Sequence, residues 1–256
     1  MDLDYLEYYV VPVLAVPRGK QNLFRFLGTG FFVGAEGHLV TCAHVVQNIT
    51  SDEALYCFQI GRHRWIPLSV FRVLCDHDLA LCTGAVPKTK EVMPLISEPF
   101  IQPGADINTL GYLHEPKGPD RLSFCRRVMR GYITSIPESS DYPDSYELSF
   151  PVLFGCSGAP LLSRFDIEGE SKSKLGIVGC VYGSRESRIV RHSEITREFS
   201  GTNKLERERE VTARIEEMGL AYNVKALLKL FEESEITITV YPGSLIDEIG
   251  LRGKVE

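Results

Sequence analysis

Hydrophobic residues along this chain fall into short runs, most of which have the two-residue period of a half-buried β-strand. Runs of this kind cover residues 108–112, 128–136 and 146–150, and Gly or Pro stands between neighbouring runs. β-Branched and aromatic residues prefer strands, whereas Gly and Pro favour turns. The pattern therefore predicts an all-β protein made of many short strands.

One segment near the C-terminus has a helical period instead. Its apolar residues include Val224, Leu227 and Phe231, which are spaced three and four positions apart. Residues at this spacing share one face of an α-helix, so residues 223–234 are expected to form a helix that packs on the preceding strands. A further strand-like run follows at residues 236–240.

A long charged stretch at residues 184–214 interrupts the strand pattern. It holds eight Lys or Arg residues and six Glu residues but few large apolar ones, so it can contribute little to a core. We expect it to leave the domain as a solvated, mobile insert. A charged hairpin or helix and a regulatory lid fit this composition equally well.

The composition supports one globular domain. The chain has 256 residues, of which 44% are hydrophobic, and this is enough to bury a full core. The formal net charge is −6, and no stripe of basic and aromatic residues is present. Nucleic acid is therefore not expected as a partner.

The N-terminal segment and the cysteines indicate the cellular compartment. Residues 1–10 are acidic without a basic region, and Pro12 breaks the apolar run at residues 10–16, so neither a signal peptide nor a membrane span is expected. That run is expected instead as an extra strand that could serve contacts between subunits. The seven cysteines are odd in number and lie mostly in apolar runs, which favours reduced thiols and a cytoplasmic protein.

Metal and cofactor binding find no support in the sequence. Cys42 and His44 lie two positions apart, as do Cys75 and His77, but neither pair has a second pair of ligands nearby in the sequence. Structural zinc sites usually need four such ligands. We therefore expect no metal and no cofactor.

The strongest chemical signal is the sequence Gly-Cys-Ser-Gly-Ala-Pro at residues 155–160, which places Ser157 in a glycine-rich turn. Glycine and serine also fill ordinary tight turns that have no catalytic role. The interpretation of Ser157 therefore depends on whether a base and an acid occur elsewhere in the chain.

Two upstream segments supply such partners. The apolar hairpin pattern of residues 28–46 leads to His44, and Asp78 begins the sequence Asp-Leu-Ala-Leu after the strand-like run at residues 70–75. Asp76 lies two positions earlier and is the alternative acid, but Asp78 is favoured because the aliphatic pattern follows it directly. A nucleophile, a base and an orienting acid are the three parts of a catalytic triad.

Together these segments resemble those of trypsin-like serine peptidases, and their compact spacing resembles that of HtrA/Deg-like peptidase domains. The order His, Asp, Ser is that of the chymotrypsin-type fold, whereas subtilisin-like and α/β-hydrolase enzymes use other orders. The resemblance implies an all-β, chymotrypsin-like fold of two packed six-stranded antiparallel β-barrels with a C-terminal helix. The active site is then expected in the cleft between the barrels.

The resemblance also implies a role for each residue. Ser157 is the nucleophile, His44 is the general base, and Asp78 is the acid that orients the imidazole. The N–H groups of Gly155 and Ser157 form the oxyanion hole. Cys156 stands where digestive trypsins carry an aspartate that pairs with a new N-terminus, so activation is expected to use a protein partner or the substrate instead.

The specificity pocket follows from the same resemblance. Pro151 stands where trypsins place the acid that binds Lys or Arg, so a basic P1 side chain is not expected. Gly179, Cys180 and Val181 are implied to form the facing wall, and Val181 stands where a glycine keeps the pocket open in trypsin-like enzymes. We therefore expect small or medium apolar P1 residues such as Ala, Val or Leu.

Residues 1–234 are expected to form the peptidase domain, with barrels at roughly residues 8–100 and 101–234, and residues 235–256 are expected to form a tail. This tail is too short for a PDZ domain, so none is expected. The sequence thus predicts a serine endopeptidase of restricted range that acts on protein or peptide substrates. The alternative is a latent or inactive protease-like binding module that requires a protein partner for activation.

Overall fold

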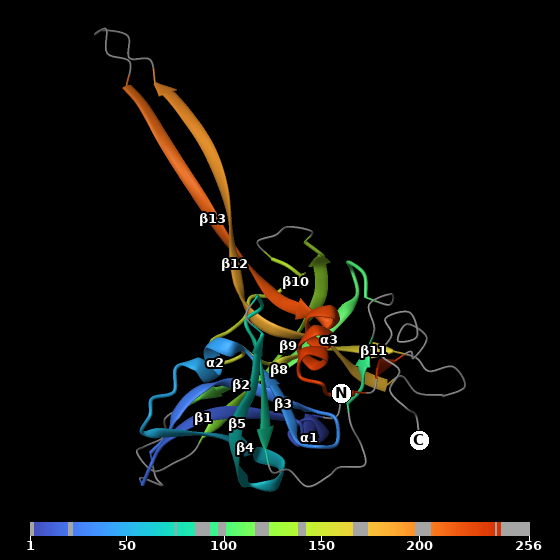
Figure 1. Ribbon diagram of the computed structural model, residues 1–256. Helices are drawn as coiled ribbons and strands as arrows, with labels where there is room; N and C mark the ends of the chain where they lie inside the picture. Colours follow the sequence, from blue (N-terminus) through green and yellow to red (C-terminus); the bar gives the residue numbers. More distant parts are fainter. Residues whose placement is uncertain are drawn as a thin grey trace.

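The computed structural model shows two β-barrels, a helix where they meet and a long two-stranded ribbon (Figure 1). It describes residues 3–19, 23–74, 76–84, 93–96, 101–115, 123–137, 142–165, 174–197, 206–238 and 240–241. No helix in these ranges has the length and hydrophobicity needed to cross a membrane.

The first barrel contains the first six strands. They follow the ring order β1-β2-β3-β6-β5-β4, and β4 pairs with β1 to close the ring. Their bounds are β1 Val10–Pro17, β2 Arg25–Val33, β3 His38–Thr41, β4 Glu53–Gln59, β5 Arg64–Leu74 and β6 Leu79–Gly84. Short helices in the same part of the chain are α1 Leu3–Leu6, α2 Ala43–Gln47 and the 3-10 helix η1 Ile60–Arg62.

Strand β1 is an integral strand of this barrel. It pairs antiparallel with β2 along one edge and with β4 along the other, and its first six residues are buried. The predicted strand at residues 10–16 is thus present, but it is part of the barrel and not an extra strand. Both edges of this strand are already paired, so it has no free edge to offer another chain.

The second barrel contains strands β8 to β13. Their ring order is β11-β8-β9-β10-β13-β12, and β12 pairs with β11 to close the ring. Their bounds are β8 Asp106–His114, β9 Phe124–Ser135, β10 Ser145–Leu148, β11 Pro160–Phe165, β12 Lys174–Arg197 and β13 Glu206–Asn223. Outside the ring, β7 (Leu95–Ile96) pairs in parallel with β12, and β14 (Val240–Tyr241) pairs in parallel with β7. The predicted pair of six-stranded antiparallel barrels is thus confirmed.

Helix α3 (Val224–Glu233) confirms the helical period near the C-terminus and packs where the two barrels meet. Asn223 caps the helix, because its side-chain oxygen accepts hydrogen bonds from the N–H groups of Lys225 and Ala226 at 2.9 and 3.3 Å. One face of the helix is buried, and the helix contacts β5 and β6 of the first barrel as well as β12 and β13 of the second.

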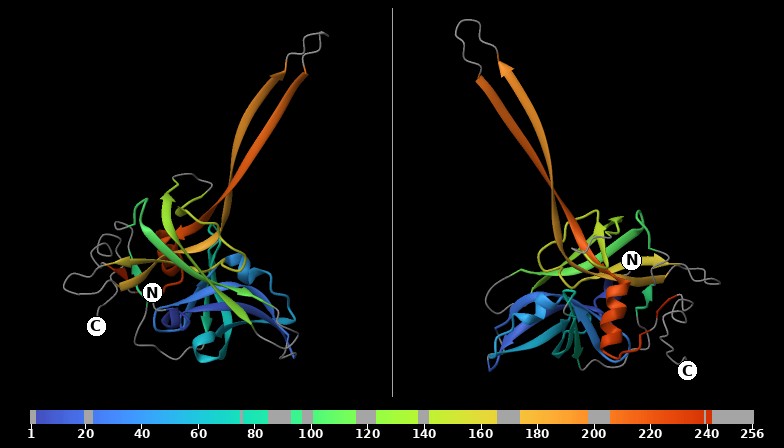
Figure 2. Two further views of the ribbon diagram at one scale, coloured as in Figure 1. Left: turned by 180° about the vertical axis from the view of Figure 1, so that it is seen from behind. Right: turned by 45° about the horizontal axis from the view of Figure 1, so that its top comes forward.

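Strands β12 and β13 continue far beyond the second barrel. They are 24 and 18 residues long and pair with each other as far as Arg197 and Glu206. The outer part of this pair, residues 185–197 and 206–218, stands away from the barrels as a two-stranded ribbon that we call the arm (Figures 1 and 2). Within the described residues, most of the charged stretch at 184–214 is therefore a hairpin and not a helix.

Two clusters of buried hydrophobic residues fill the barrels, and one of them continues from the first barrel into the second. It includes Leu110 and Tyr112 of β8 and the buried face of α3. Tyr112 is fully buried, and its hydroxyl donates a hydrogen bond to the carbonyl oxygen of Val10 at 3.0 Å. A continuous, close-packed core thus fixes how the two barrels are oriented.

Candidate active site

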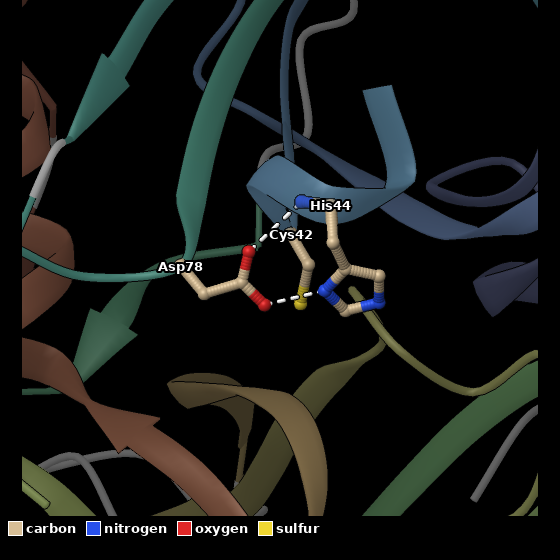
Figure 3. Close-up of side chains that lie close together, drawn as sticks. All are labelled: Cys42, His44 and Asp78. Carbon is tan, nitrogen blue, oxygen red and sulfur yellow. Dashed lines mark hydrogen bonds and ion pairs between the residues drawn. The ribbon is translucent and has the colours of Figure 1, made fainter. Parts of the chain in front are cut away.

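His44 and Asp78 come together because β3 and β6 are neighbours in the first barrel. Thr41 at the end of β3 pairs with Ala80 of β6, so the residues just beyond these strands also meet. The Asp78 carboxylate accepts hydrogen bonds from the main-chain N–H of His44 at 2.8 Å and from its Nδ1, while the other ring nitrogen points away from it (Figure 3). A carboxylate at Nδ1 fixes one tautomer of an imidazole and leaves Nε2 free to take a proton.

The second candidate acid, Asp76, has other partners. Its carboxylate pairs with Lys229 of α3, and one of its oxygens lies 3.6 Å from Nδ1 of His77. The bond from the Lys229 ammonium is the main reason that the pKa of Asp76 is lowered. Of the two acids, therefore, Asp78 is the one in contact with His44.

Ser157 lies in a tight turn between β10 and β11 that requires glycine at two positions. Gly155 and Gly158 both have φ of 84°, a left-handed conformation that other residues rarely adopt. A Cβ atom on Gly158 would lie 2.1 Å from the Thr29 carbonyl oxygen, and a Cβ atom on Gly155 would lie 2.3 Å from that of Tyr112. Both backbone conformation and close contact with β2 and β8 thus explain the two glycines.

Thr29 of β2 ties this turn to the first barrel. Its N–H donates to the carbonyl oxygen of Ser157 at 2.9 Å, and its hydroxyl donates to that of Gly155 at 2.7 Å. The same hydroxyl accepts a hydrogen bond from the N–H of Tyr112 in β8 at 3.1 Å. Thr29 is fully buried, so water does not compete for these bonds. It was not among the predicted site residues, although it is the central residue of a Gly-Thr-Gly sequence.

His44, Gly155 and Ser157 line one pocket with a volume of about 410 Å³. Its other lining residues come from β2, from the turn before Ser157 and from β12 and β13: Leu27, Val152, Leu153, Phe154, Gly183, Ser184, Glu186 and Glu217. Within the described chain, the N–H groups of Gly155 and Ser157 donate to no acceptor, whereas those of Cys156 and Gly158 donate to carbonyl oxygens at 3.0 and 2.8 Å. The two N–H groups predicted for the oxyanion hole are thus free to bind another acceptor.

The residues predicted to form the facing wall do not line this pocket. Cys180 and Val181 are fully buried, and Gly179 is covered by β13. The pairing of β12 with β13 shifts between Val181 and Gly183, and such a bulge re-aims the residues that follow it. Gly183 and Ser184 line the pocket instead.

Pro151 also lies outside the pocket lining, directly before Val152, which does line it. The Val152 N–H donates to Ser184 Oγ at 2.7 Å, so the two walls are joined by a hydrogen bond. Val181 packs in the core of the second barrel and does not shorten the pocket. A Cβ atom on Gly183 would meet no atom within 4 Å, so this wall is open.

Cys42 lies beside the candidate pair, and its Sγ lies within 4.8 Å of ligand atoms of His44 and Asp78 (Figure 3). The thiol is fully buried, and this burial raises its pKa well above the usual range. It donates to the carbonyl oxygen of Val181 at 3.3 Å. Because metals bind the thiolate, and because Nδ1 of His44 already binds Asp78, this cluster does not fit a metal site.

The Cys156 thiol is also unsuited to nucleophilic chemistry. Burial raises the pKa of Cys156, next to the candidate nucleophile, to about 11, so this thiol stays protonated at neutral pH. Six of the seven cysteines lie in the described residues, and none of these six forms a disulfide. Cys75 lies outside the described residues.

Comparisons with known proteins agree with this geometry. The family model of the trypsin-like peptidase domain matches residues 28–167, which is more than half of the chain and includes His44, Asp78 and Ser157. The crystal structure of the serine endoprotease from Yersinia pestis has a similar fold, with a TM-score of 0.52 and 15% identity. The similarity covers 90% of this chain but only 63% of that chain. No curated protein sequence matches. The chain belongs to the trypsin-like peptidase domain family.

Proposed function

We propose that this protein is a serine endopeptidase of restricted substrate range, which hydrolyses peptide bonds in protein or peptide substrates. One observation carries the proposal: His44 and Ser157, which come from different barrels, line the same pocket. Asp78 supports it, because its carboxylate is hydrogen-bonded to the imidazole of His44. The family match adds that these residues stand in a peptidase domain.

Each residue has a defined role in the proposed reaction. Nε2 of His44 takes the proton of Ser157 Oγ as this oxygen attacks the scissile carbonyl carbon, and Asp78 stabilises the imidazolium that forms. The N–H groups of Gly155 and Ser157 bind the negative oxygen of the intermediate, and each such donor is worth about 100- to 1,000-fold in rate. When the C–N bond breaks, His44 passes its proton to the leaving amine. Water then hydrolyses the acyl-enzyme by the same steps.

The proposed P1 preference is for small or medium apolar side chains such as Ala, Val or Leu. Four residues that line the pocket have large apolar side chains: Leu27, Val152, Leu153 and Phe154. The two carboxylates in the lining, Glu186 and Glu217, are cross-strand neighbours at the base of the arm. We assign them to substrate residues beyond P1, because they lie outside the barrels.

A latent or inactive module that needs a protein partner for activation is the second candidate function. It is favoured by one observation: within the described residues, no hydrogen bond joins Ser157 Oγ to His44. A partner that moves the nucleophile turn relative to His44 would complete the triad. Catalytic hydrogen bonds often form only in the substrate complex, so the same observation also fits an active enzyme.

We further propose a cytoplasmic location. The six described cysteines are free, and five of them are buried. Free thiols of this kind persist in reducing compartments, where disulfides are rare.

Labelling with a fluorophosphonate probe tests the proposed function, because such probes react with activated serine nucleophiles. Wild-type protein, Ser157→Ala and the control Ser69→Ala are compared with and without cell lysate. Ser69 is exposed on β5 and does not line the pocket, so its replacement leaves labelling unchanged.

We expect the wild type and Ser69→Ala to be labelled and Ser157→Ala to remain unlabelled. Labelling of the wild type only in the presence of lysate supports the latent enzyme and a missing activator. Absence of labelling under both conditions overturns the peptidase in favour of the binding module.

A further inference from the structure

We propose that Tyr222 and His77 are positioning residues through which the second barrel holds the acid Asp78. This inference rests on the proposed function, because it concerns how Asp78 orients the general base His44. Asp78 is the last residue of a turn at residues 76–78 that joins β5 to β6 of the first barrel. The side chains that hold this turn, however, come from the second barrel and from α3.

Tyr222 binds the backbone of Asp78. The Asp78 N–H donates a hydrogen bond to the Tyr222 hydroxyl at 2.9 Å. Tyr222 is 7% exposed, and its ring stacks on Tyr182 with 4.2 Å between ring centroids. Burial raises the pKa of Tyr222 to about 12, so its hydroxyl stays neutral and does not repel the Asp78 carboxylate. Because the ring is buried and stacked, its neutral hydroxyl is held in place as an acceptor for this backbone N–H.

His77 holds the middle residue of the same turn. Its ring packs edge-on against Tyr222 with 5.2 Å between centroids, and its Nε2 lies 3.2 Å from Oδ2 of Asp144 in the second barrel. The His77 side chain is 3% exposed, and its Nδ1 makes no hydrogen bond within the described residues but lies 3.6 Å from Oδ1 of Asp76. An apolar ring would fill the same space but would lose the contacts of both ring nitrogens with these carboxylates.

The first residue of the turn is also held by a side chain from outside the first barrel. Asp76 pairs with Lys229 of α3, the helix that follows directly after β13. Each of the three consecutive residues 76–78 is therefore in contact with a side chain of the second barrel or of α3: Asp76 with Lys229, His77 with Asp144 and Tyr222, and Asp78 with Tyr222. This arrangement fixes the turn of the first barrel against the second barrel.

The backbone position of Asp78 decides the orientation of His44. Both oxygens of the Asp78 carboxylate are used, one for the His44 N–H and one for its Nδ1, so a shift of Asp78 moves the imidazole as well. The second barrel also carries Ser157. Tyr222 and His77 thus align the base with the nucleophile, without touching the substrate themselves.

Tyr222→Phe is the first test, because it removes the hydroxyl and keeps the stacked ring. Tyr182→Phe is its matched control, because this second tyrosine of the stack bonds Ser145 and not Asp78. We expect Tyr222→Phe to lower kcat about tenfold with KM unchanged, the rate equivalent of one hydrogen bond. Tyr182→Phe is expected to change kcat less than about twofold.

The His77 variants give an independent test. His77→Phe removes the bond to Asp144 and keeps a ring against Tyr222, so kcat is expected to fall. His77→Gln retains a donor for Asp144 and is expected to recover part of the lost rate. Melting temperatures of all variants show whether they are folded.

Proton NMR gives a readout that needs no turnover. The proton in the hydrogen bond between His44 Nδ1 and Asp78 is expected to give a downfield resonance, and the disappearance of this resonance in His44→Gln assigns it. We expect Tyr222→Phe to shift or broaden this resonance and Tyr182→Phe to leave it unchanged.

Two results would overturn the inference: folded Tyr222→Phe with wild-type kcat and resonance, or equal effects of Tyr222→Phe and Tyr182→Phe. Failure of the proposed function looks different, because the wild type would then show neither turnover nor fluorophosphonate labelling. In that event the resonance alone decides whether Tyr222 positions Asp78.

Discussion

The two barrels hold their candidate catalytic residues in different ways. In the first barrel, His44 and Asp78 are joined by hydrogen bonds between neighbouring elements of that same barrel. In the second barrel, Ser157 lies in a turn whose carbonyl groups bond across to Thr29 of the first barrel. The candidate base and acid meet within one barrel, whereas the candidate nucleophile reaches its place only when the barrels dock. Docking therefore sets the reactive geometry.

The largest effect on turnover is expected when the candidate nucleophile is removed and the packing of the two barrels is left intact. Ser157→Ala is expected to lower turnover by about 10⁴- to 10⁶-fold, because the nucleophilic oxygen is lost. The melting temperature is expected to stay within a few degrees, because Ser157 Oγ makes no hydrogen bond within the described residues. Steady-state hydrolysis and thermal unfolding measure the two quantities. Turnover that survives in this variant contradicts the triad.

The next largest effect is expected when the docking of the nucleophile turn is broken. In Gly158→Ala the new Cβ atom would lie 2.1 Å from the Thr29 carbonyl oxygen and 2.3 Å from Thr41 Oγ1. We expect turnover to fall by at least about 100-fold and the free energy of unfolding to fall by about 2–4 kcal/mol.

Gly104→Ala is the matched control for this variant. Gly104 has φ of 90°, close to the 84° of Gly158, but no atom lies within 4 Å of its Cβ position. The control therefore carries the backbone strain without the clash. Equal losses of turnover in the two variants would show that contact with the first barrel is not the cause.

A smaller effect is expected when one bond between the barrels is removed. Thr29→Val keeps the shape of the side chain but leaves the Gly155 carbonyl and the Tyr112 N–H without their partner. We expect the free energy of unfolding to fall by about 1–3 kcal/mol and kcat to fall about tenfold. Thr109→Val is the control, because Thr109 is also fully buried but its hydroxyl has no partner in the described residues. A comparable loss of stability and kcat in the control would show that the hydrogen bonds of Thr29 between the barrels are not the cause.

The smallest effect is expected outside both barrels, at the base of the arm. Glu217 is exposed and lines the pocket, so Glu217→Gln removes a negative charge near the bound substrate. We expect kcat/KM to fall about two- to threefold for peptides with Lys or Arg before the P1 residue, and only at low salt. Glu36→Gln, in the exposed turn between β2 and β3, is the control. An effect that persists at high salt would exclude this electrostatic explanation.

Features that depend on local pattern could be predicted from the sequence. The alternating runs at residues 108–112, 128–136 and 146–150 overlap β8, β9 and β10, and the helical period at 223–234 corresponds to α3. The hairpin pattern of residues 28–46 also predicted that His44 follows a pair of strands, as it does after β2 and β3. Such features need only neighbouring residues to be recognised, because period and turn chemistry are local.

Features that depend on contacts between distant residues could not be predicted. The bulge in β12 that moves the pocket wall to Gly183 and Ser184 exists only through pairing with β13. The bond from Thr29 to Gly155 spans 126 residues, and the bond from Asp78 to Tyr222 spans 144 residues. The Gly-Thr-Gly sequence marks Thr29 but not its distant partners, and no local pattern marks Tyr222, because each residue acts where the two barrels meet.

The arm has a mechanical consequence for the pocket. β12 is one continuous strand that contributes Gly183 and Ser184 to the pocket wall and then extends to Arg197 in the arm. A strand that is hydrogen-bonded to its neighbour along this length transmits a displacement along its axis. A molecule that binds the outer end of the arm and displaces it along this axis would therefore displace the pocket wall as well.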